Sequence, residues 1–147
     1  MDDPKRYNRY RSANRTFETY YPYYSGETGS PFDRTEELER EWEMVEEMTE
    51  NCTTDLEKAL VVHDHLVRTI QYSASLGAFV AHDIEGAIFE KKCVCEGYAL
   101  AYKYYMNRLN IPCKVVNGVS KGQPHAWNQI KINGKWYFVD ATWDDGS

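Results

Sequence analysis

The amino-acid sequence predicts an α+β fold, with helices in the earlier part of the chain and an antiparallel sheet in the last part. Between Thr35 and Asn110 apolar residues recur every three or four positions, whereas apolar and polar residues alternate after Pro112. The dipeptide Asn133-Gly134 separates two alternating runs and is a strong hairpin signal. Because 147 residues suffice for one hydrophobic core and not for two ordinary domains, we expect a single compact domain.

Composition and charge narrow the class of protein. The formal net charge is -6, and nucleic acids and anionic membranes attract cationic surfaces, so neither is an expected partner. No apolar run approaches the roughly 20 residues that span a bilayer. The opening MDDPKRYNRY also lacks the apolar stretch of a signal peptide. These features leave the location open, because a domain excised from an extracellular or cell-surface protein would look the same.

Residues 1–34 are expected to form an arm rich in tyrosine and arginine, ahead of a domain over residues 35–147. Five basic residues of the arm lie from Lys5 to Arg15, and tyrosines surround and follow them. Basic and aromatic side chains together can line a groove for single-stranded nucleic acid. The overall negative charge disfavours that use, and we expect the arm to pack its tyrosines on the domain.

A first amphipathic helix is predicted from Thr35 to about Glu50. Apolar residues recur there at helical spacing, and glutamates occupy the other faces. The apolar positions are Leu38, Trp42, Val45 and Met48. A solvent-exposed face explains the glutamates without a binding role.

A second helix is predicted from Thr54 to about Thr69. Its start is indicated by Thr54 and Glu57, which have the spacing of a capping box. The stripe expected to face the core comprises Leu56, Leu60, His63, Val67 and Ile70. His65 then points to a different side of the helix from His63, so the two cannot readily share a metal ion. Half-buried histidines with satisfied hydrogen bonds are expected instead.

The next segment leads to a pair of cysteines, Cys93 and Cys95. Residues 73–81 are expected to form a loop, and Asp83 to cap a short helix over residues 84–92. A third long helix is predicted to begin at or just before Cys95, because apolar residues recur at helical spacing from there to Leu109. Cys95 therefore lies at a helix N-terminus.

Three strands are predicted in the last part of the chain, over residues 113–119, 125–132 and 135–140. They follow one another with short connections, which is typical of an antiparallel meander. Helices followed by such a meander complete the α+β layout.

The turn at Asn133-Gly134 also predicts which residues lie opposite one another. A two-residue turn pairs Ile132 with Lys135, and each step outward adds one residue on each side. By this count Trp127 faces Asp140, and His125 faces Thr142. His125 and Asp140 are then diagonal neighbours on one face, roughly 7 to 8 Å apart at the backbone, which side chains can close.

The four cysteines are expected to be free thiols, because a domain of this size does not need disulfides. They are Cys52, Cys93, Cys95 and Cys113. Without CxxC pairs or regular ligand spacing they do not indicate a metal site, and we expect neither a metal nor a cofactor.

Cys95 is the thiol best placed to react. The positive end of its helix dipole favours thiolate, an adjacent imidazole can form an ion pair with it, and a carboxylate can fix that imidazole. Cys95, His125 and Asp140 could therefore make an acyl-transfer site, with Glu96 slightly opposing thiolate formation. The alternative use of a cysteine in front of a helix, as a small buried apolar residue, is common.

Four blocks of the sequence resemble the transglutaminase-like superfamily, whose core is papain-like. They are VVHDHLVRTIQY (61–72), VCEGYALAY (94–102), IPCKVV (111–116) and HAWNQIKINGKWYFVDATWDD (125–145). The resemblance covers about residues 54–145. It implies a fold in which the nucleophile helix packs on an antiparallel sheet, and a triad of Cys95, His125 and Asp140. The histidine and aspartate of this triad are the pair that the hairpin register selects, and Cys95 is the thiol at the helix N-terminus.

The resemblance implies acyl transfer on amide bonds of a protein or peptide substrate, through a thioester on Cys95. Transfer to water would make the protein a protease or amidase, and transfer to an amine would make it a transglutaminase; hydrolysis is slightly favoured. A catalytically silent binding module of a larger surface protein is the alternative. The oligomeric state is left open.

Further site residues are expected around the triad. The oxyanion is expected to bind the backbone N–H of Cys95 together with a side chain, for which Tyr72 and His82 are the candidates. Tyr98 and Trp127 could wall the substrate cleft, although aromatic core packing explains them equally well. Cys93 is expected to be a spacer, with trapping of an oxidised Cys95 as the less favoured role.

Overall fold

In a computed structural model the described part of the chain is residues 34–144. Five side chains within this range are outside the description, namely those of Thr35, Ala78, Phe79, Trp143 and Asp144. The predicted Tyr/Arg-rich arm lies outside the described residues, apart from Arg34.

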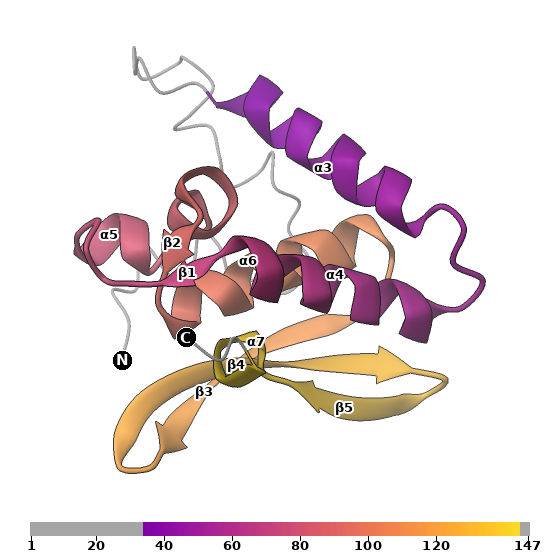
Figure 1. The fold of residues 1–147 in the computed structure, drawn as a ribbon. Helices are drawn as coiled ribbons and strands as arrows, with labels where there is room; N and C mark the ends of the chain where they lie inside the picture. Colours follow the sequence, from indigo (N-terminus) through magenta and orange to yellow (C-terminus); the bar gives the residue numbers. More distant parts are fainter. Residues whose placement is uncertain (1–33, 145–147) are drawn as a thin grey trace.

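A long helix, α6 (Cys95–Arg108), is the centre of the fold and is buried along most of its length. Helix α4 (Asp55–Thr69) packs against it on one side and a three-stranded antiparallel sheet on the other, while α3 (Thr35–Thr49) covers α4 (Figure 1). The structure thus confirms the α+β prediction and the packing of the cysteine-bearing helix on the sheet. No helix within residues 34–144 has both the length and the apolar character to cross a membrane.

The two N-terminal helices begin and end close to the predicted residues. Helix α3 buries Leu38, Trp42 and Val45 as expected. Helix α4 starts with the predicted capping box, in which the Thr54 hydroxyl accepts from the N–H of Glu57 and the Glu57 carboxylate accepts from the N–H of Thr54. These reciprocal bonds satisfy backbone donors that a helix start would otherwise leave unpaired.

The stripe predicted to face the core on α4 was wrong at Leu56 and Leu60, whereas Ile70 is buried and Val67 packs against the core as expected. The buried residues of this helix are Ala59, Val62, His65 and Leu66. Leu56 and Leu60 are 50% and 53% exposed instead. Ala59 faces α6, where the Tyr102 hydroxyl donates to the Ala59 carbonyl at 3.0 Å, and its small side chain allows this close approach.

Of the two histidines of α4, His63 is half-buried as expected, whereas His65 is in the core. His65 is buried edge-on against Tyr105, with ring centroids 6.5 Å apart, and burial lowers its pKa. His63 is half-buried, and its Nδ1 lies 3.0 Å from Asp64 Oδ1. The two rings point to different sides of the helix, as predicted.

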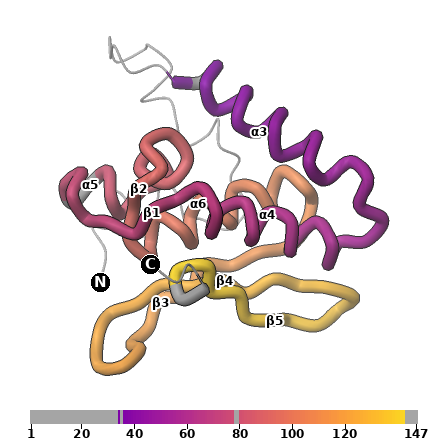
Figure 2. Tube along the Cα trace, in the orientation of Figure 1, coloured from indigo at the N-terminus to yellow at the C-terminus, as the bar shows by residue number. Residues whose placement is uncertain are grey.

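The segment between α4 and α6 contains short elements, several of which the sequence did not indicate. Strand β1 (Gln71–Tyr72) pairs in parallel with β2 (Lys92–Cys93), and helix α5 (Ala78–Ala81) lies within the predicted loop. The short helix predicted over residues 84–92 is a single π-helical segment, η2 (Glu85–Glu90). The expected cap by Asp83 was wrong, because the N-cap residue is Ile84 and the Asp83 carboxylate accepts from the N–H of Ile84, at 2.7 Å. Figure 2 follows the chain from this segment into α6.

The sheet has the predicted order and register. Its strands are β3 (Cys113–Ser120), β4 (Gln123–Ile132) and β5 (Lys135–Val139), in the order β3-β4-β5. Ile132 pairs with Lys135, which confirms the register that the two-residue turn predicts. The expected pairing of His125 with Thr142 was wrong, because the chain enters helix α7 (Ala141–Asp144), which packs on α4 and α6.

Asn128 joins the central helix to the sheet. It is 1% exposed, and its side-chain Nδ2 donates to the carbonyl oxygens of Ala99 in α6 at 2.9 Å and Lys114 in β3 at 3.2 Å. A buried amide with both partners fixes helix and sheet in one relative position.

We expect Asn128→Leu to lower the free energy of unfolding by about 1 to 3 kcal/mol, because it removes the donor to two carbonyl groups in the interior. Urea denaturation measures the change. Gln129→Leu is the matched control, since it makes a similar substitution at the next residue, on the opposite face of β4. Equal losses in both variants would contradict the role assigned to Asn128.

Candidate active site

Cys95 is the first residue of α6, and a close packing contact holds it there. Val94, with extended backbone, precedes the helix and donates its N–H to the Ala81 carbonyl at 2.9 Å. A Cβ at Gly97 would lie 2.8 Å from Cys93 Sγ and 3.0 Å from the Ala81 oxygen. Glycine at position 97 therefore lets the incoming chain pack on the first turn, and buried Cys93 fills the space, which agrees with a packing role for this residue.

His125 and Asp140 lie together as the hairpin register predicts. His125 Nε2 donates to Asp140 Oδ2 at 2.7 Å, and the two side chains are 10% and 19% exposed. Strand β5 ends at Val139, so Asp140 is the first residue beyond the ladder, one step past the pair of Asn128 with Val139. The hairpin alone brings these residues, 15 positions apart, into contact.

The part of β4 that extends beyond the end of β5 connects the His125–Asp140 pair to the thiol of Cys95. In an antiparallel sheet, alternate residues of a central strand form backbone hydrogen bonds with the strand on one side or the other. Because Ile132 pairs with Lys135 at the turn, the even-numbered residues of β4 form theirs with β5. Ala126 would be next, but β5 has already ended. Its N–H is instead directed at the Cys95 sulfur, where it stabilises the thiolate. The sulfur thus lies beside the residue that follows His125.

The electrostatic environment of Cys95 differs from the expected one. Burial raises the pKa of the Cys95 thiol and outweighs the backbone N–H groups of Ala126 and Glu96, which lower the pKa. The negative charges of Glu96 and Asp140 raise the pKa further, and for Glu96 this effect was predicted. The position at a helix N-terminus is therefore not enough by itself to make the resting group a thiolate.

Tyr72 lies beside the two cysteines. Burial raises the pKa of the Tyr72 hydroxyl, and the charges of Cys95 and Cys93 add to that effect. Strand pairing explains the location, because Tyr72 in β1 pairs with Cys93 in β2, two residues before Cys95. The side chain is 46% exposed, so a bound molecule can reach it.

The other expected site residues have different surroundings. His82 Nδ1 lies 3.2 Å from Glu96 Oε1, so His82 contacts the carboxylate that follows the thiol in sequence. Nothing in the sequence linked these two residues, which are brought together by the turn after α5. Tyr98 is 1% exposed and donates to the Ile70 carbonyl at 3.3 Å; it is a core residue, outside the surface that a substrate can contact. Trp127 stacks on His125.

Of the other tryptophans, Trp136 lies on the outer side of the sheet below Lys114, whose Nζ is 4.1 Å from the ring centroid. All four cysteines are free thiols, as expected. Within the described residues no three His, Cys, Asp or Glu side chains are grouped closely enough to hold a metal ion.

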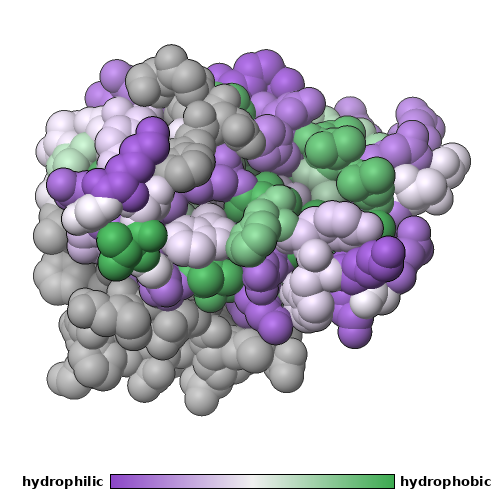
Figure 3. Space-filling model, turned by 90° about the horizontal axis from the view of Figure 1, so that it is seen from below, coloured by the Kyte–Doolittle hydropathy of each residue, from purple (hydrophilic) through white to green (hydrophobic). Residues whose placement is uncertain are grey.

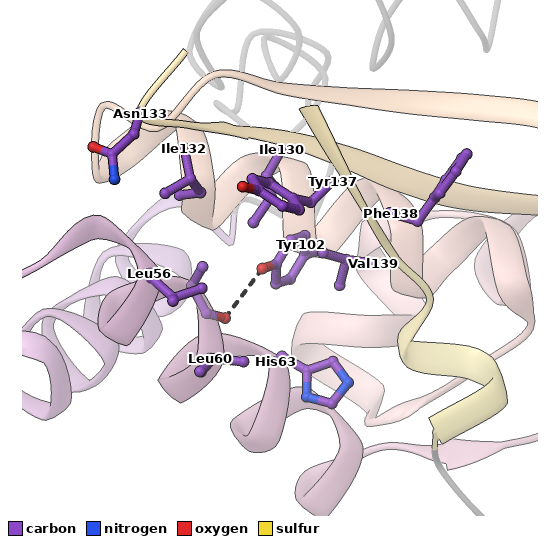
Figure 4. A pocket seen from close by; sticks show the side chains of 11 residues that line it. Leu56, Leu60, His63, Tyr102, Ile130, Ile132, Asn133, Tyr137, Phe138 and Val139 are labelled. Atoms are coloured by element: carbon purple, nitrogen blue, oxygen red, sulfur yellow. Dashed lines mark hydrogen bonds between the residues drawn. The ribbon is translucent and has the colours of Figure 1, made fainter. Parts of the chain in front are cut away.

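A separate apolar groove of about 400 Å³ lies between α4 and the β4–β5 hairpin. Figure 4 shows Leu56, Leu60 and His63 of α4 on one side and Ile130, Tyr137 and Val139 of the hairpin on the other. The misassigned leucines of α4 thus line this groove. Seen from below, the surface has apolar patches among polar side chains (Figure 3). Neither Cys95 nor His125 lines the groove.

The central helix beginning with a cysteine, packed on an antiparallel sheet that carries a histidine–aspartate pair, defines a papain-like class of α+β domain. The family model described as the transglutaminase-like superfamily matches residues 43–141. The chain belongs to this superfamily, which includes cysteine proteases and transglutaminases.

Known proteins similar to this chain agree with the assignment. Kyphoscoliosis peptidase of Homo sapiens is 28% identical over 71% of this chain, and the match spans only 18% of that relative. The crystal structure of a TGase superposes with a TM-score of 0.63 at 17% identity, covering 86% of this chain and 37% of that one. A candidate cysteine protease from Cytophaga hutchinsonii has a TM-score of 0.62 at 19% identity, covering 71% and 37%. At these identities the two structures show the fold alone.

Glu96→Gln is expected to lower the pKa of Cys95, because it removes a negative charge that disfavours thiolate while keeping the side-chain shape. The midpoint of the pH profile for iodoacetamide alkylation of Cys95, followed by mass spectrometry, should therefore move to lower pH. Glu43→Gln, which changes an exposed carboxylate on α3, should leave the midpoint in place. A midpoint that stays or rises in Glu96→Gln would contradict the assigned charge effect.

Proposed function

We propose that this protein catalyses cysteine-dependent acyl transfer on amide bonds of a protein or peptide. The observation that carries the proposal is the 2.7 Å bond between His125 and Asp140, one residue from the Ala126 N–H that faces the Cys95 sulfur. An imidazole held by a carboxylate beside a thiol is the arrangement that nucleophilic catalysis by cysteine needs.

In the proposed reaction His125 acts first as a general base. Because burial raises the pKa of Cys95, the thiol carries its proton until attack, and the imidazole accepts that proton as the sulfur bonds to the amide carbonyl. Asp140 binds Nε2, so Nδ1 is the ring nitrogen assigned to proton transfer. The negative charge of Asp140 stabilises the imidazolium that forms.

Collapse of the tetrahedral intermediate completes the first half of the reaction. The imidazolium gives its proton to the departing amine, and the acyl group stays on Cys95 as a thioester. A water molecule or a second amine then attacks the thioester, and His125 removes the proton from that nucleophile. The C–S bond breaks, the acid or the new amide leaves, and the proton returns from the imidazolium to the Cys95 sulfur. None of these steps needs a cofactor.

The oxyanion is assigned to the backbone N–H of Cys95 and the hydroxyl of Tyr72. The location of Tyr72 next to both cysteines and its partial exposure support this role. His82 is the weaker candidate, since the structure pairs it with Glu96. The triad and the oxyanion donors are thus assigned to the same reaction at Cys95.

Hydrolysis is the favoured outcome for the thioester. The name of the similar human protein, kyphoscoliosis peptidase, supports this choice, while the match spans less than a fifth of that relative. The alternative is a binding module that has kept the fold without the chemistry. An enzyme and a binding module differ in whether Cys95 is more reactive than the other cysteines.

Incubation with a peptide library, with and without a primary amine, is expected to give shortened peptides. Cys95→Ala should abolish these products, and His125→Ala should lower their rate of formation by about 10² to 10⁴-fold. A mass gain on glutamine in the presence of the amine would replace hydrolysis by transglutamination. Absence of any product, together with alkylation of Cys95 no faster than that of partly exposed Cys52, would support the binding module.

Tyr72→Phe is expected to lower kcat on a cleaved peptide by about 10²-fold with little change in KM, because an oxyanion donor acts in the transition state. Tyr137→Phe is the control, since Tyr137 is similarly exposed, at 49%, and lies in the separate groove. The iodoacetamide reaction forms no oxyanion, so its rate at Cys95 should stay near the wild-type value. An equal fall in alkylation would place Tyr72 in activation of the thiol instead.

A further inference from the structure

The imidazole of His125 has an aromatic neighbour on its own strand. The rings of His125 and Trp127 are stacked, with centroids 5.5 Å apart and planes inclined by 27°. Residues two apart on a strand point to the same face, so the backbone alone brings the rings side by side. Offset stacking of this kind is a favourable geometry for two aromatic rings.

A glycine on the neighbouring strand provides the space in which the indole lies. Gly118 of β3 pairs with His125 of β4. A Cβ at Gly118 would lie 2.7 Å from Cη2 of Trp127 and 3.4 Å from Cζ3. Atoms this close overlap, so even an alanine at position 118 would push the indole away.

Space, not backbone conformation, accounts for glycine at this position. The described glycines with positive φ are Gly77, Gly122 and Gly134. Gly118 is not among them and lies within the regular ladder of β3 and β4. An L-residue could adopt its backbone conformation, and the indole of Trp127 is what the missing side chain accommodates.

Asp140 and Trp127 restrain different motions of the imidazole. The bond from Nε2 to Asp140 fixes one atom of the ring, and a single hydrogen bond still allows the ring plane to turn about it. The indole lies against the ring face and opposes that rotation. Together they hold the second nitrogen, Nδ1, in a fixed direction.

We propose that Gly118 and Trp127 are positioning residues for His125, acting through the stack of indole on imidazole. The inference rests on the proposed function, because it assigns the stack the task of directing Nδ1 at the Cys95 thiol. Misplacement of a catalytic group by about 1 Å can cost 10²-fold in rate. Displacing the indole should therefore slow proton transfer while leaving the triad residues present.

A double-mutant cycle tests the inference with Gly118→Ala, Trp127→Phe and the two combined. Phenylalanine lacks Cη2, the atom that the new methyl group would meet, so the combined variant removes the overlap. In the wild-type background Gly118→Ala should slow alkylation of Cys95 at pH 6.5 by about 10-fold or more. In the Trp127→Phe background the same change should have little further effect.

Two further measurements distinguish positioning from a loss of stability. The pH profile of alkylation should change shape in Gly118→Ala, because its His125-dependent part is reduced, and thermal unfolding should show that the variant is folded at the assay temperature. The ring protons of His125 should also lose the ring-current shift that Trp127 causes in the NMR spectrum. Equal, additive rate losses in both backgrounds, or an unchanged pH profile, would overturn the inference.

Failure of this inference and failure of the proposed function give different results. If His125→Ala alkylates at the wild-type rate, the proposed function is wrong, and the stack has no catalytic ring to direct. If His125→Ala is slow while Gly118→Ala matches the wild type, the function stands and the positioning role is wrong. Both outcomes come from one reagent and one set of variants.

Discussion

The register set by the turn at Asn133-Gly134 is the constraint on which the candidate site depends. Pairing Ile132 with Lys135 puts Asp140 one residue beyond the last ladder pair, within hydrogen-bond distance of His125. The end of β5 at that point also leaves the N–H of Ala126 without a strand partner and directs it to Cys95. A shift of one residue would turn the inward side chains of the strand to the other face and separate the groups.

Two glycines allow close packing near the candidate site, one in the first turn of α6 and one in strand β3. Gly97 lets the chain entering α6 lie against the first helical turn, over Cys93. Gly118 gives the indole of Trp127 room beside His125. Asn128 then holds α6 on the sheet through the Ala99 carbonyl. These contacts fix the position of the helix relative to the hairpin, as the candidate active site requires.

Opposing electrostatic effects set the state of the thiol. Burial and the carboxylates of Glu96 and Asp140 disfavour thiolate, while two backbone N–H groups favour it. Asp140 has two roles in the proposed mechanism, because its charge opposes the free thiolate and would stabilise the imidazolium of His125. A site of this kind is suited to keep the sulfur protonated before attack, which limits unwanted oxidation, and to release the proton only during attack.

The sequence by itself determined the features that depend on neighbours along the chain. Helix starts at Thr54 and Cys95, the hairpin and the contact of His125 with Asp140 all follow from local rules of capping and turn geometry. Only the tertiary structure decided which face of α4 is buried, because Leu56 and Ala59 both fit an amphipathic pattern and the approach of Tyr102 selects Ala59. The pair of His82 with Glu96, the core location of Tyr98 and the indole over Gly118 also required the fold, since each depends on segments that meet only after packing.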